Sequence, residues 1–362
     1  MNYVKTGGSL RLLAFSLVAV IVALSVTVAV SGWSPEETDK PGDHATDETI
    51  PPESETEEEP VTDPAINLKP KYYYYLTGLE CEEGEIADIP YAFVTDPSLT
   101  SYGISLASMV IEIPIENGNT RFLIFNQNID SLGKIGAFAP TRDYITDVAI
   151  LFGANLVSTG NDDLFDYTSI QNAGVIDLSE YEDYYYKEGA KYVFSNKNMI
   201  SELSKKLKLP LTDDSRDYAF NFANPGEMIG GITKANTISL AYQSSVTTLK
   251  YNAATKSYAL YKSSVEKIDP LNATTASFDN VFILFADSTT YERSSGIQTV
   301  IETSTSGSGY YCTGGDAKEI RWHASDGNIT FEDLDGNPLI CNRGTTYMGY
   351  FKSSAMDGVR FE

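Results

Sequence analysis

Hydrophobic and polar positions divide the start of the chain into very different segments. Residues 12–33, LLAFSLVAVIVALSVTVAVSGW, contain no charge and, at about 1.5 Å per residue, would span a hydrocarbon core of roughly 30 Å as a helix. We predict a transmembrane anchor here, after a short tail at residues 1–11. The alternative is a cleaved signal peptide, whose apolar region is typically about 7–15 residues long. Lys5 and Arg11 precede the span, which predicts a cytoplasmic N-terminus and an extracytoplasmic remainder at the cell membrane.

Residues 34–71 are rich in Pro, Glu, Thr and Asp and contain few large apolar side chains. Twelve acidic residues stand against three basic ones, a net charge of −9 (3 − 12). Such a segment buries too little apolar surface to offset the entropy lost on ordering. We predict a disordered, self-repelling tether.

The alternating patterns of a folded region begin near residue 72. Two apolar runs flank the turn Asn117–Asn119, which is typical of a β-hairpin. DYITDVAILF, residues 143–152, has apolar residues at helical spacing, and SNKNMISELSKKLKLP is an amphipathic helix that Ser195 or Asn196 would cap. These elements predict an N-terminal α/β domain over residues 72–231, which ends in a Gly/Pro cluster.

From residue 232 to residue 353 the pattern is that of β-strands. TISLAYQ, VTTLKYN and KSYALYKS alternate between apolar and polar residues, and VFILFAD is typical of a buried strand. These segments predict a mostly antiparallel C-terminal β domain. The expected fold class is therefore α+β, with the anchor and the linker in front of it.

Composition and charge limit the classes of function that the chain could have. The net charge of −24 argues against a nucleic-acid partner, because phosphate binding needs a basic surface. Only two histidines occur, His44 in the tether and His323 in EIRWHA, and no nucleophile elbow, HExxH, phosphate loop or dinucleotide fingerprint is present. We therefore predict no catalytic residue, no metal site and no cofactor.

Arg121 and Arg142 are the first candidate ligand-binding residues. Arg121 follows the hairpin turn, and Arg142 with Asp143 opens the helix-like segment, where a guanidinium beside backbone amides favours an anion. The alternative is structural, in which each arginine pairs with a nearby carboxylate such as Asp143 or Asp147.

Two further sets of residues are candidates. Asn161 and Asp162 belong to a polar loop that could hold a cation or a sugar hydroxyl, or that is simply a turn. Cys312 and Cys341 lie in neighbouring β segments and are candidates for a disulfide, if the strand register brings their Cα atoms within about 7 Å.

Five segments carry a family resemblance. They are LTGL, GNTRFLIF, KIGAFAPTRDY and the pair GYYCTGGDAKEIRW with FEDLDGNPLICNRGTTY. In this order they resemble the YerB-like bacterial lipoproteins, a two-part family without an assigned activity. The resemblance covers about Leu76 to Phe351.

The departures from the family concern polar residues. Where the family usually carries two arginines three apart, this chain has Ala139 and Arg142, and Ser158 stands where the family tends to show a histidine. The lipid-bearing cysteine of the family is replaced by the apolar span. If those residues form a site in relatives, this chain holds a reduced version of it.

Two functions follow as hypotheses. The first is a membrane-anchored, non-catalytic binding or scaffold protein of the bacterial cell envelope, whose partner is a cell-wall component or an envelope protein. The second is an envelope phosphotransferase or hydrolase acting on a lipid-linked glycan. TRFLIFNQNIDSLGKIGAFAPTRDY is faintly similar to LytR-CpsA-Psr phosphotransferases, which would place Arg142 on a pyrophosphate and Asp143 on a metal or a proton.

Overall fold

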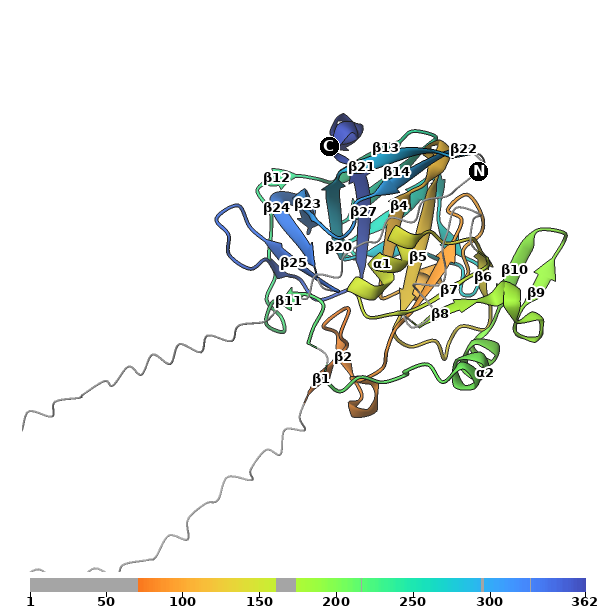
Figure 1. The fold of residues 1–362 in the computed structure, drawn as a ribbon. Helices are drawn as coiled ribbons and strands as arrows, with labels where there is room; N and C mark the ends of the chain where they lie inside the picture. Colours follow the sequence, from red (N-terminus) through yellow and green to blue (C-terminus); the bar gives the residue numbers. More distant parts are fainter. Residues whose placement is uncertain (1–70, 161–173, 216, 294–295, 326) are drawn as a thin grey trace, which may run out of the picture. The chain divides into compact units, whose positions relative to one another are not determined.

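The computed structural model describes residues 71–160, 174–215, 217–293, 296–325 and 327–362 (Figure 1). Within these residues the protein is mainly β, with two α-helices, α1 (Asp143–Leu151) and α2 (Lys197–Leu207). None of the described helices is long and apolar enough to cross a bilayer. The anchor predicted at residues 12–33 lies outside the described residues, as do the tail and almost all of the tether.

A large sheet organises the described part of the chain, with 14 strands there. In spatial order its main path runs through β12 (Thr233–Lys234), β24 (Asp316–Ser325), β23 (Ser306–Thr313), β20 (Asn280–Ala286), β27 (Thr346–Lys352), β4 (Met109–Pro114), β5 (Thr120–Asn126), β3 (Tyr91–Thr95), β6 (Ile135–Phe138), β10 (Tyr192–Ser195) and β9 (Tyr186–Glu188). Three strands lie off this path: β25 (Asn328–Glu332) on β24, β7 (Asn155–Ser158) on β3 and β8 (Val175–Asp177) on β7.

The centre of this sheet joins the N-terminal and C-terminal parts of the chain. Strand β27 pairs in parallel with β4 on one side, from Thr346 opposite Met109 to Gly349 opposite Glu112, and in parallel with β20 on the other. All residues of β4 and β20 are buried. Continuous apolar runs such as VFILFA are expected where both faces of a strand are covered.

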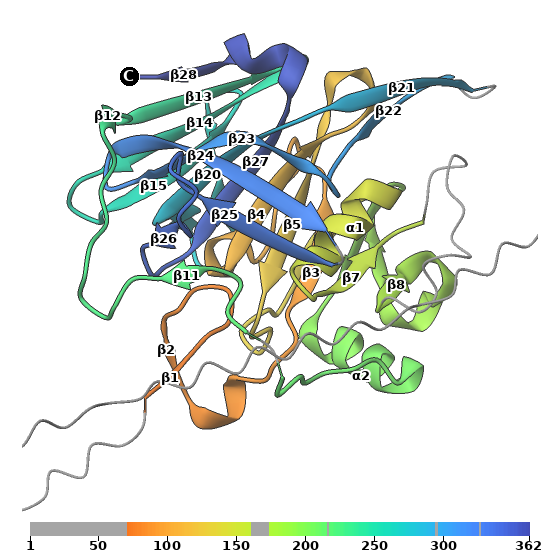
Figure 2. The same ribbon diagram turned by 60° about the vertical axis from the view of Figure 1, so that its left-hand side comes forward.

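Smaller sheets complete the fold. One has six described strands, β16 (Val265–Glu266), β15 (Ser257–Lys262), β14 (Ser245–Asn252), β13 (Thr237–Tyr242), β28 (Val359–Phe361) and β19 (Ser277–Phe278), and is called the small sheet below (Figure 2). Two-stranded pairs are β1 (Tyr72–Tyr73) with β2 (Glu80–Cys81), β11 (Asn221–Phe222) with β26 (Ile340–Cys341), β17 (Ile268–Asp269) with β18 (Thr274–Thr275), and β21 (Ser288–Arg293) with β22 (Gly296–Ile301).

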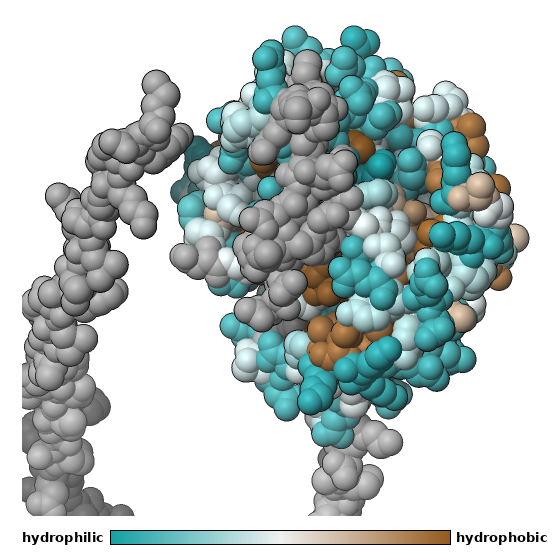
Figure 3. Space-filling model, turned by 45° about the vertical axis from the view of Figure 1, so that its right-hand side comes forward, coloured by the Kyte–Doolittle hydropathy of each residue, from teal (hydrophilic) through white to brown (hydrophobic). Residues whose placement is uncertain are grey.

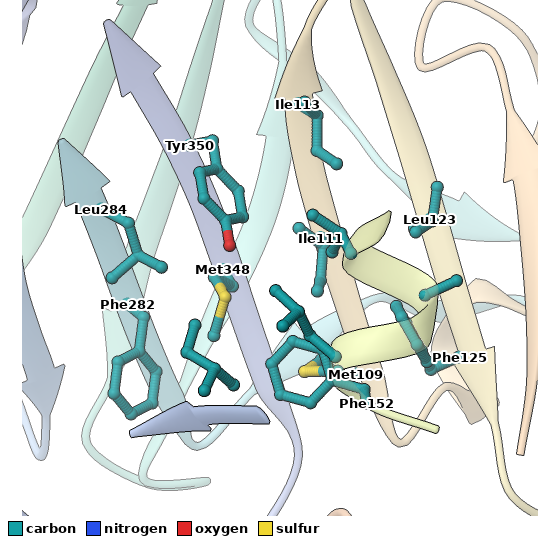
Figure 4. Packing of buried hydrophobic residues seen from close by; sticks show 14 of the residues in the cluster. Met109, Ile111, Ile113, Leu123, Phe125, Phe152, Phe282, Leu284, Met348 and Tyr350 are labelled. Atoms are coloured by element: carbon teal, nitrogen blue, oxygen red, sulfur yellow. The ribbon is translucent and has the colours of Figure 1, made fainter. Parts of the chain in front are cut away.

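Alternate residues of the central strands fill two separate cores on the two faces of the large sheet. On one face, Phe282 and Leu284 pack with residues of β4, β5 and β27, and Phe152 at the end of α1 meets Phe125 at 5.8 Å between ring centroids (Figure 4). On the other face, Val281 and Ile283 share a core with apolar residues of the small sheet. The small sheet and α1 therefore cover opposite faces.

This two-faced arrangement contradicts the disulfide predicted between Cys312 and Cys341. Cys312 belongs to the core under the small sheet, whereas Cys341 belongs to the core on the α1 face. Both are buried free thiols, and Cys81 is free as well. Cys312 lies opposite Val281 in the large sheet, whereas Cys341 belongs to β26, which pairs with β11 in a separate two-stranded sheet. Proximity in the sequence could not reveal this difference.

Several predicted elements are present. The hairpin forms between β4 and β5, with its turn in a short 3-10 segment, Glu116–Gly118. The helix predicted over residues 143–152 is α1, and α2 begins after Asn196, whose side chain accepts from the backbone of Asn198 and Met199. Short polar N-caps of this kind satisfy the free amides of a helix start.

The predicted fold class is confirmed only in its coarser form, two domains with mainly β structure and few helices. The α/β unit reduces to β6, α1 and β7, with β7 parallel to β3. The C-terminal part is mostly antiparallel as predicted, but β27 is parallel to both of its neighbours. A sequence pattern indicates whether a strand is buried but does not indicate which strand it pairs with. The long-range pairing of β27 was therefore not predicted.

Candidate functional site

Arg142 is a buried ion-pair residue at the start of α1. It is the N-cap residue with an extended backbone, and its side chain is 6% exposed. Its Nε lies 3.2 and 3.1 Å from the two carboxylate oxygens of Glu116, its Nη2 lies 2.8 Å from Oε2, and its Nη1 donates to the carbonyl of Thr141 at 2.6 Å. This geometry supports the structural alternative, although the carboxylate comes from the hairpin turn 26 residues earlier rather than from a neighbour in sequence.

Arg121, at the start of β5, lies close to Arg142. Its Nη1 is 3.5 Å from a carboxylate oxygen of Asp96 and donates to the carbonyl of Thr120 at 3.2 Å. Among the described residues nothing accepts from its buried Nε. Burial lowers the pKa of the Arg121 guanidinium, Asp96 opposes this, and the positive charge of Arg142 lowers it further. The structure thus brings the two predicted arginines together.

A pocket of about 440 Å³ opens beside Arg121. It lies where the loop after β3 and the start of β5 meet two turns of the small sheet, so both the N-terminal and the C-terminal parts of the chain form it. We call it the basic pocket. Its lining residues are Asp96, Pro97, Ser98, Asn119, Thr120, Arg121, Ser244, Ser245, Lys262, Ser263, Val265 and Lys267.

Lys267 supplies the least compensated charge of the basic pocket. Its Nζ donates to the carbonyls of Pro97 at 3.0 Å and Leu99 at 2.7 Å, and neither acceptor is a carboxylate. Burial, and after it the charge of nearby Lys262, lower the pKa of Lys267 from 10.5 to about 8, although the carboxylates of Asp96 and Glu112 oppose this shift. Desolvation penalises the charged form of a lysine, so a bound anion would be favoured here.

Lys262, in contrast, is held in a buried network. Its side chain is 7% exposed and forms an ion pair with Glu112, which is fully buried. Its Nζ also lies 3.0 Å from the hydroxyl of Thr247 and 3.3 Å from that of Thr120.

The Glu112 carboxylate accepts from further groups around it. The hydroxyls of Thr120 and Thr247 donate at 2.6 and 2.7 Å, and that of Tyr347 donates as well. We call Glu112, Thr120, Thr247, Lys262 and Tyr347 the Glu112 network. Because a buried charge is tolerated only when it is paired and hydrogen-bonded, this network fixes the floor of the basic pocket.

The charges of this arrangement favour an anion. Three cationic side chains and one carboxylate line the basic pocket, and counting Glu112 beneath it leaves three cations against two anions. No histidine or cysteine is among the lining residues. The pocket is thus a locally positive site on a chain whose net charge is −24, and such a site attracts anions over the surrounding field.

The other predicted site residues lie elsewhere. Asp143 is exposed in the first turn of α1, where a carboxylate stabilises a helix, and it accepts from the backbone of Tyr144 at 3.2 Å. Asn161 and Asp162 lie outside the described residues. In the part of the chain that the structure describes, no group of three or more His, Cys, Asp or Glu side chains could hold a metal ion.

Sequence reasoning missed three residues of this site. Glu112 stands in the apolar strand MVIEIP, and Lys262 occupies the position after Tyr258 and Leu260 on the inward face of KSYALYKS. A charge at an inward position of a strand is the signal that could have found both. Lys267 follows a short turn-rich segment, and no pattern marks it.

Two positions at which the family resemblance fails, Ala139 and Ser158, are not among the residues that line the basic pocket. Ala139 is buried, and its carbonyl accepts from the amide of Thr159 at 3.3 Å. Ser158 is fully buried, and its hydroxyl has no partner among the described residues. The two substituted positions are therefore neighbours in space.

Comparisons with known proteins agree with this architecture. The chain is similar to the YerB protein from Bacillus subtilis, whose crystal structure superposes with a TM-score of 0.71 at 18% identity, covering 81% of this chain and 100% of that one. At this identity the likeness shows the fold. No curated protein matches the chain.

Two family domains match in sequence order. Residues 76–208 match the N-terminal domain, and residues 237–348 match the C-terminal domain, of a family described as protein of unknown function (DUF3048). These bounds agree with the resemblance found in the sequence between Leu76 and Phe351. The chain belongs to the DUF3048 family of YerB-like proteins.

Proposed function

We propose that this chain is a non-catalytic binding protein of the bacterial cell envelope that holds an anionic group in the basic pocket. The observation that carries this proposal is the convergence of Arg121, Lys262 and Lys267 in a pocket with one lining carboxylate. Among the described residues the Lys267 ammonium donates to two main-chain carbonyls and to no carboxylate, so an incoming carboxylate or phosphate would gain a charge-assisted hydrogen bond there.

The surroundings of the basic pocket support a polar ligand. Ser245, Ser263 and Asn119 add hydroxyl and amide groups to its lining. Outside the atoms drawn in grey, the face of the folded part shown in Figure 3 is mostly hydrophilic, with hydrophobic residues in small groups. Surfaces of this kind favour recognition by charge and hydrogen bonds over a broad apolar contact.

The envelope location rests on the N-terminal sequence. In this proposal residues 12–33 anchor the chain in the cell membrane, and residues 34–71 hold the folded part outside the cell. The acidic tether, with a net charge of −9, would keep that part away from the anionic membrane surface.

The alternative of a phosphotransferase or hydrolase gains no specific support. That function would require Arg142 to reach a pyrophosphate, whereas its guanidinium is buried and bound to Glu116. We therefore keep the binding function as the proposal.

The test is a thermal-shift titration of the full-length chain in detergent, at constant ionic strength, with inorganic phosphate, pyrophosphate and citrate as probes and glucose as the neutral comparison. A ligand at one hundred times its Kd adds about 2.7 kcal/mol of stability. We expect a rise of Tm with at least one anion and no rise with glucose.

Variants make this test specific. Lys267→Met keeps the apolar stem and removes the charge, and we expect it to abolish the shift. Lys205→Met removes an exposed lysine from the last turn of α2 and is expected to retain the shift. An equal shift in Lys267→Met, or no shift with any anion, would contradict the proposal.

A further inference from the structure

A second pocket, of about 640 Å³, lies on the small sheet and is independent of the basic pocket. We call it the strand groove. Its lining residues are Lys250, Tyr251, Asn252, Ala253, Thr255, Ser257, Ala259, Tyr261, Glu266, Thr274, Thr275 and Ser277. None of these residues lines the basic pocket.

The strand register shows how the groove is built. Ala259 pairs with Lys250 of β14 on one side and with Ser277 of β19 on the other. Tyr258 and Leu260, the neighbours of Ala259 along β15, belong to the core against the large sheet. Because side chains alternate along a strand, Ala259 and its cross-strand partners point away from that core.

Small side chains form the floor of the groove, and larger ones rise at its sides. Ser257, Ala259 and Ser277 are short, whereas Lys250 and Tyr261 are long. The Lys250 ammonium lies 4.5 Å from the centroid of the Tyr261 ring. A cation in this position stands over a ring face, so the face of Tyr261, rather than its edge, is turned toward the groove.

The polar groups of the groove are nearly neutral in sum. Lys250 and Glu266 are the charged residues of the lining, one of each sign. Thr275 donates to a carboxylate oxygen of Glu266 at 2.5 Å, which orients that carboxylate. Thr255 and Ser257 share a hydrogen bond at 2.9 Å.

This combination fits one chemical class of ligand. Hydroxyl and amide groups both donate and accept, and they match a ligand that carries many hydroxyls. An aromatic face offers an apolar platform with a polar tip, which suits a ring having one apolar face and polar edges. The balanced charge gives no preference for an anion, in contrast to the basic pocket.

We infer that the strand groove binds a neutral oligosaccharide, with a sugar ring stacked on Tyr261 and its hydroxyls bound by Lys250, Asn252 and Glu266. A ligand in this position displaces the Lys250 ammonium from the ring face, and the ammonium then serves as a donor to the sugar. The inference does not depend on anion binding at the basic pocket.

The experiment is isothermal titration calorimetry of the full-length chain in detergent with two probes, chitotetraose and cellotetraose. We expect binding of at least one probe. Tyr261→Ala should weaken that binding at least about tenfold, which corresponds to about 1.4 kcal/mol. Tyr261→Phe keeps the ring and should stay within about threefold of the wild type, a difference of less than 1 kcal/mol on the same scale.

A second variant keeps the test valid if Tyr261→Ala unfolds. Ala259→Leu fills the floor from a side chain that points out of the core, so it is expected to fold and to lose saccharide binding. Lys267→Met, in the basic pocket, is expected to bind each probe with the same affinity as the wild type does. Absence of binding to both probes, or unchanged binding in Tyr261→Ala and Ala259→Leu, would overturn the inference.

Discussion

Two lysines of the basic pocket differ in how their charges are compensated. Lys262 lies in its floor, and Lys267 lies at what we call its rim. Lys262 in the floor is 7% exposed and is neutralised by Glu112 within a network of hydroxyls. Lys267 at the rim has two main-chain carbonyls as acceptors. A paired buried charge such as Lys262 stabilises the architecture, whereas the less compensated charge of Lys267 nearby is the one at which we propose that an anion binds.

The largest expected loss of unfolding free energy comes from removing Glu112 beneath the floor of the basic pocket. Glu112→Ala leaves Lys262 buried without its carboxylate, and loss of one partner of a buried pair costs about 3–5 kcal/mol of unfolding free energy. Urea unfolding followed by circular dichroism measures this loss.

A double variant sharpens the interpretation. Glu112→Leu combined with Lys262→Met replaces the buried pair by apolar side chains, and it should recover part of the lost stability. Recovery should be incomplete because the buried hydroxyls of Thr120, Thr247 and Tyr347 lose their acceptor. If Glu112→Ala alone costs less than about 1 kcal/mol, in the range of an exposed pair, the Glu112 network does not hold the two parts of the chain together.

A smaller effect is expected at the second buried pair. Arg142→Ala removes the hydrogen bonds that the guanidinium makes to Glu116 and Thr141, and hydrogen bonds to charged groups contribute about 1.5–3 kcal/mol. Arg142→Lys keeps the charge without the planar fork, so its stability should lie between those of the wild type and Arg142→Ala. Anion-induced shifts at the basic pocket should persist in both variants, and their disappearance would assign Arg142 a role in binding.

The smallest expected effect is the pH dependence that Lys267, at the rim of the basic pocket, gives to stability and to anion affinity. The pKa of Lys267 is lowered from 10.5 to about 8, so between these values the unfolded chain binds more protons at this residue than the folded chain. The stability of the free protein, relative to Lys267→Met, should therefore rise as pH increases through this window. Anion affinity should fall over the same window, because binding needs the protonated amine.

Paired measurements at pH 7 and pH 9 check this prediction. Phosphate titrations report the affinity, and urea unfolding of the wild type and of Lys267→Met reports the stability difference. Comparison with the variant cancels the titration of other groups. If both the phosphate affinity and the stability relative to Lys267→Met fall as the pH rises, Lys267 is not the group that titrates.

Local patterns predicted the local elements well. The hairpin turn at Asn117–Asn119, the helix beginning at Asp143 and the Asn196 cap all depend on residues within one or two turns of each other. Of the candidate ligand-binding residues, Arg121 lines the basic pocket, whereas Arg142 is bound to Glu116 and does not line it. Their carboxylate partners were not predicted, because Asp96 and Glu116 lie more than 20 residues away in sequence.

The sequence was sufficient to identify the periodicity of strands and helices, the apolar and acidic N-terminal segments and the family. Each of these depends on neighbouring residues or on motifs in a fixed order. The tertiary structure was needed to show that β27 joins β4 in one sheet, that Cys312 and Cys341 belong to different cores, and that Lys262, Lys267 and Arg121 line one pocket. These outcomes depend on strand partner and register, which are set by the burial of both faces at once and by pairings between residues far apart in the chain.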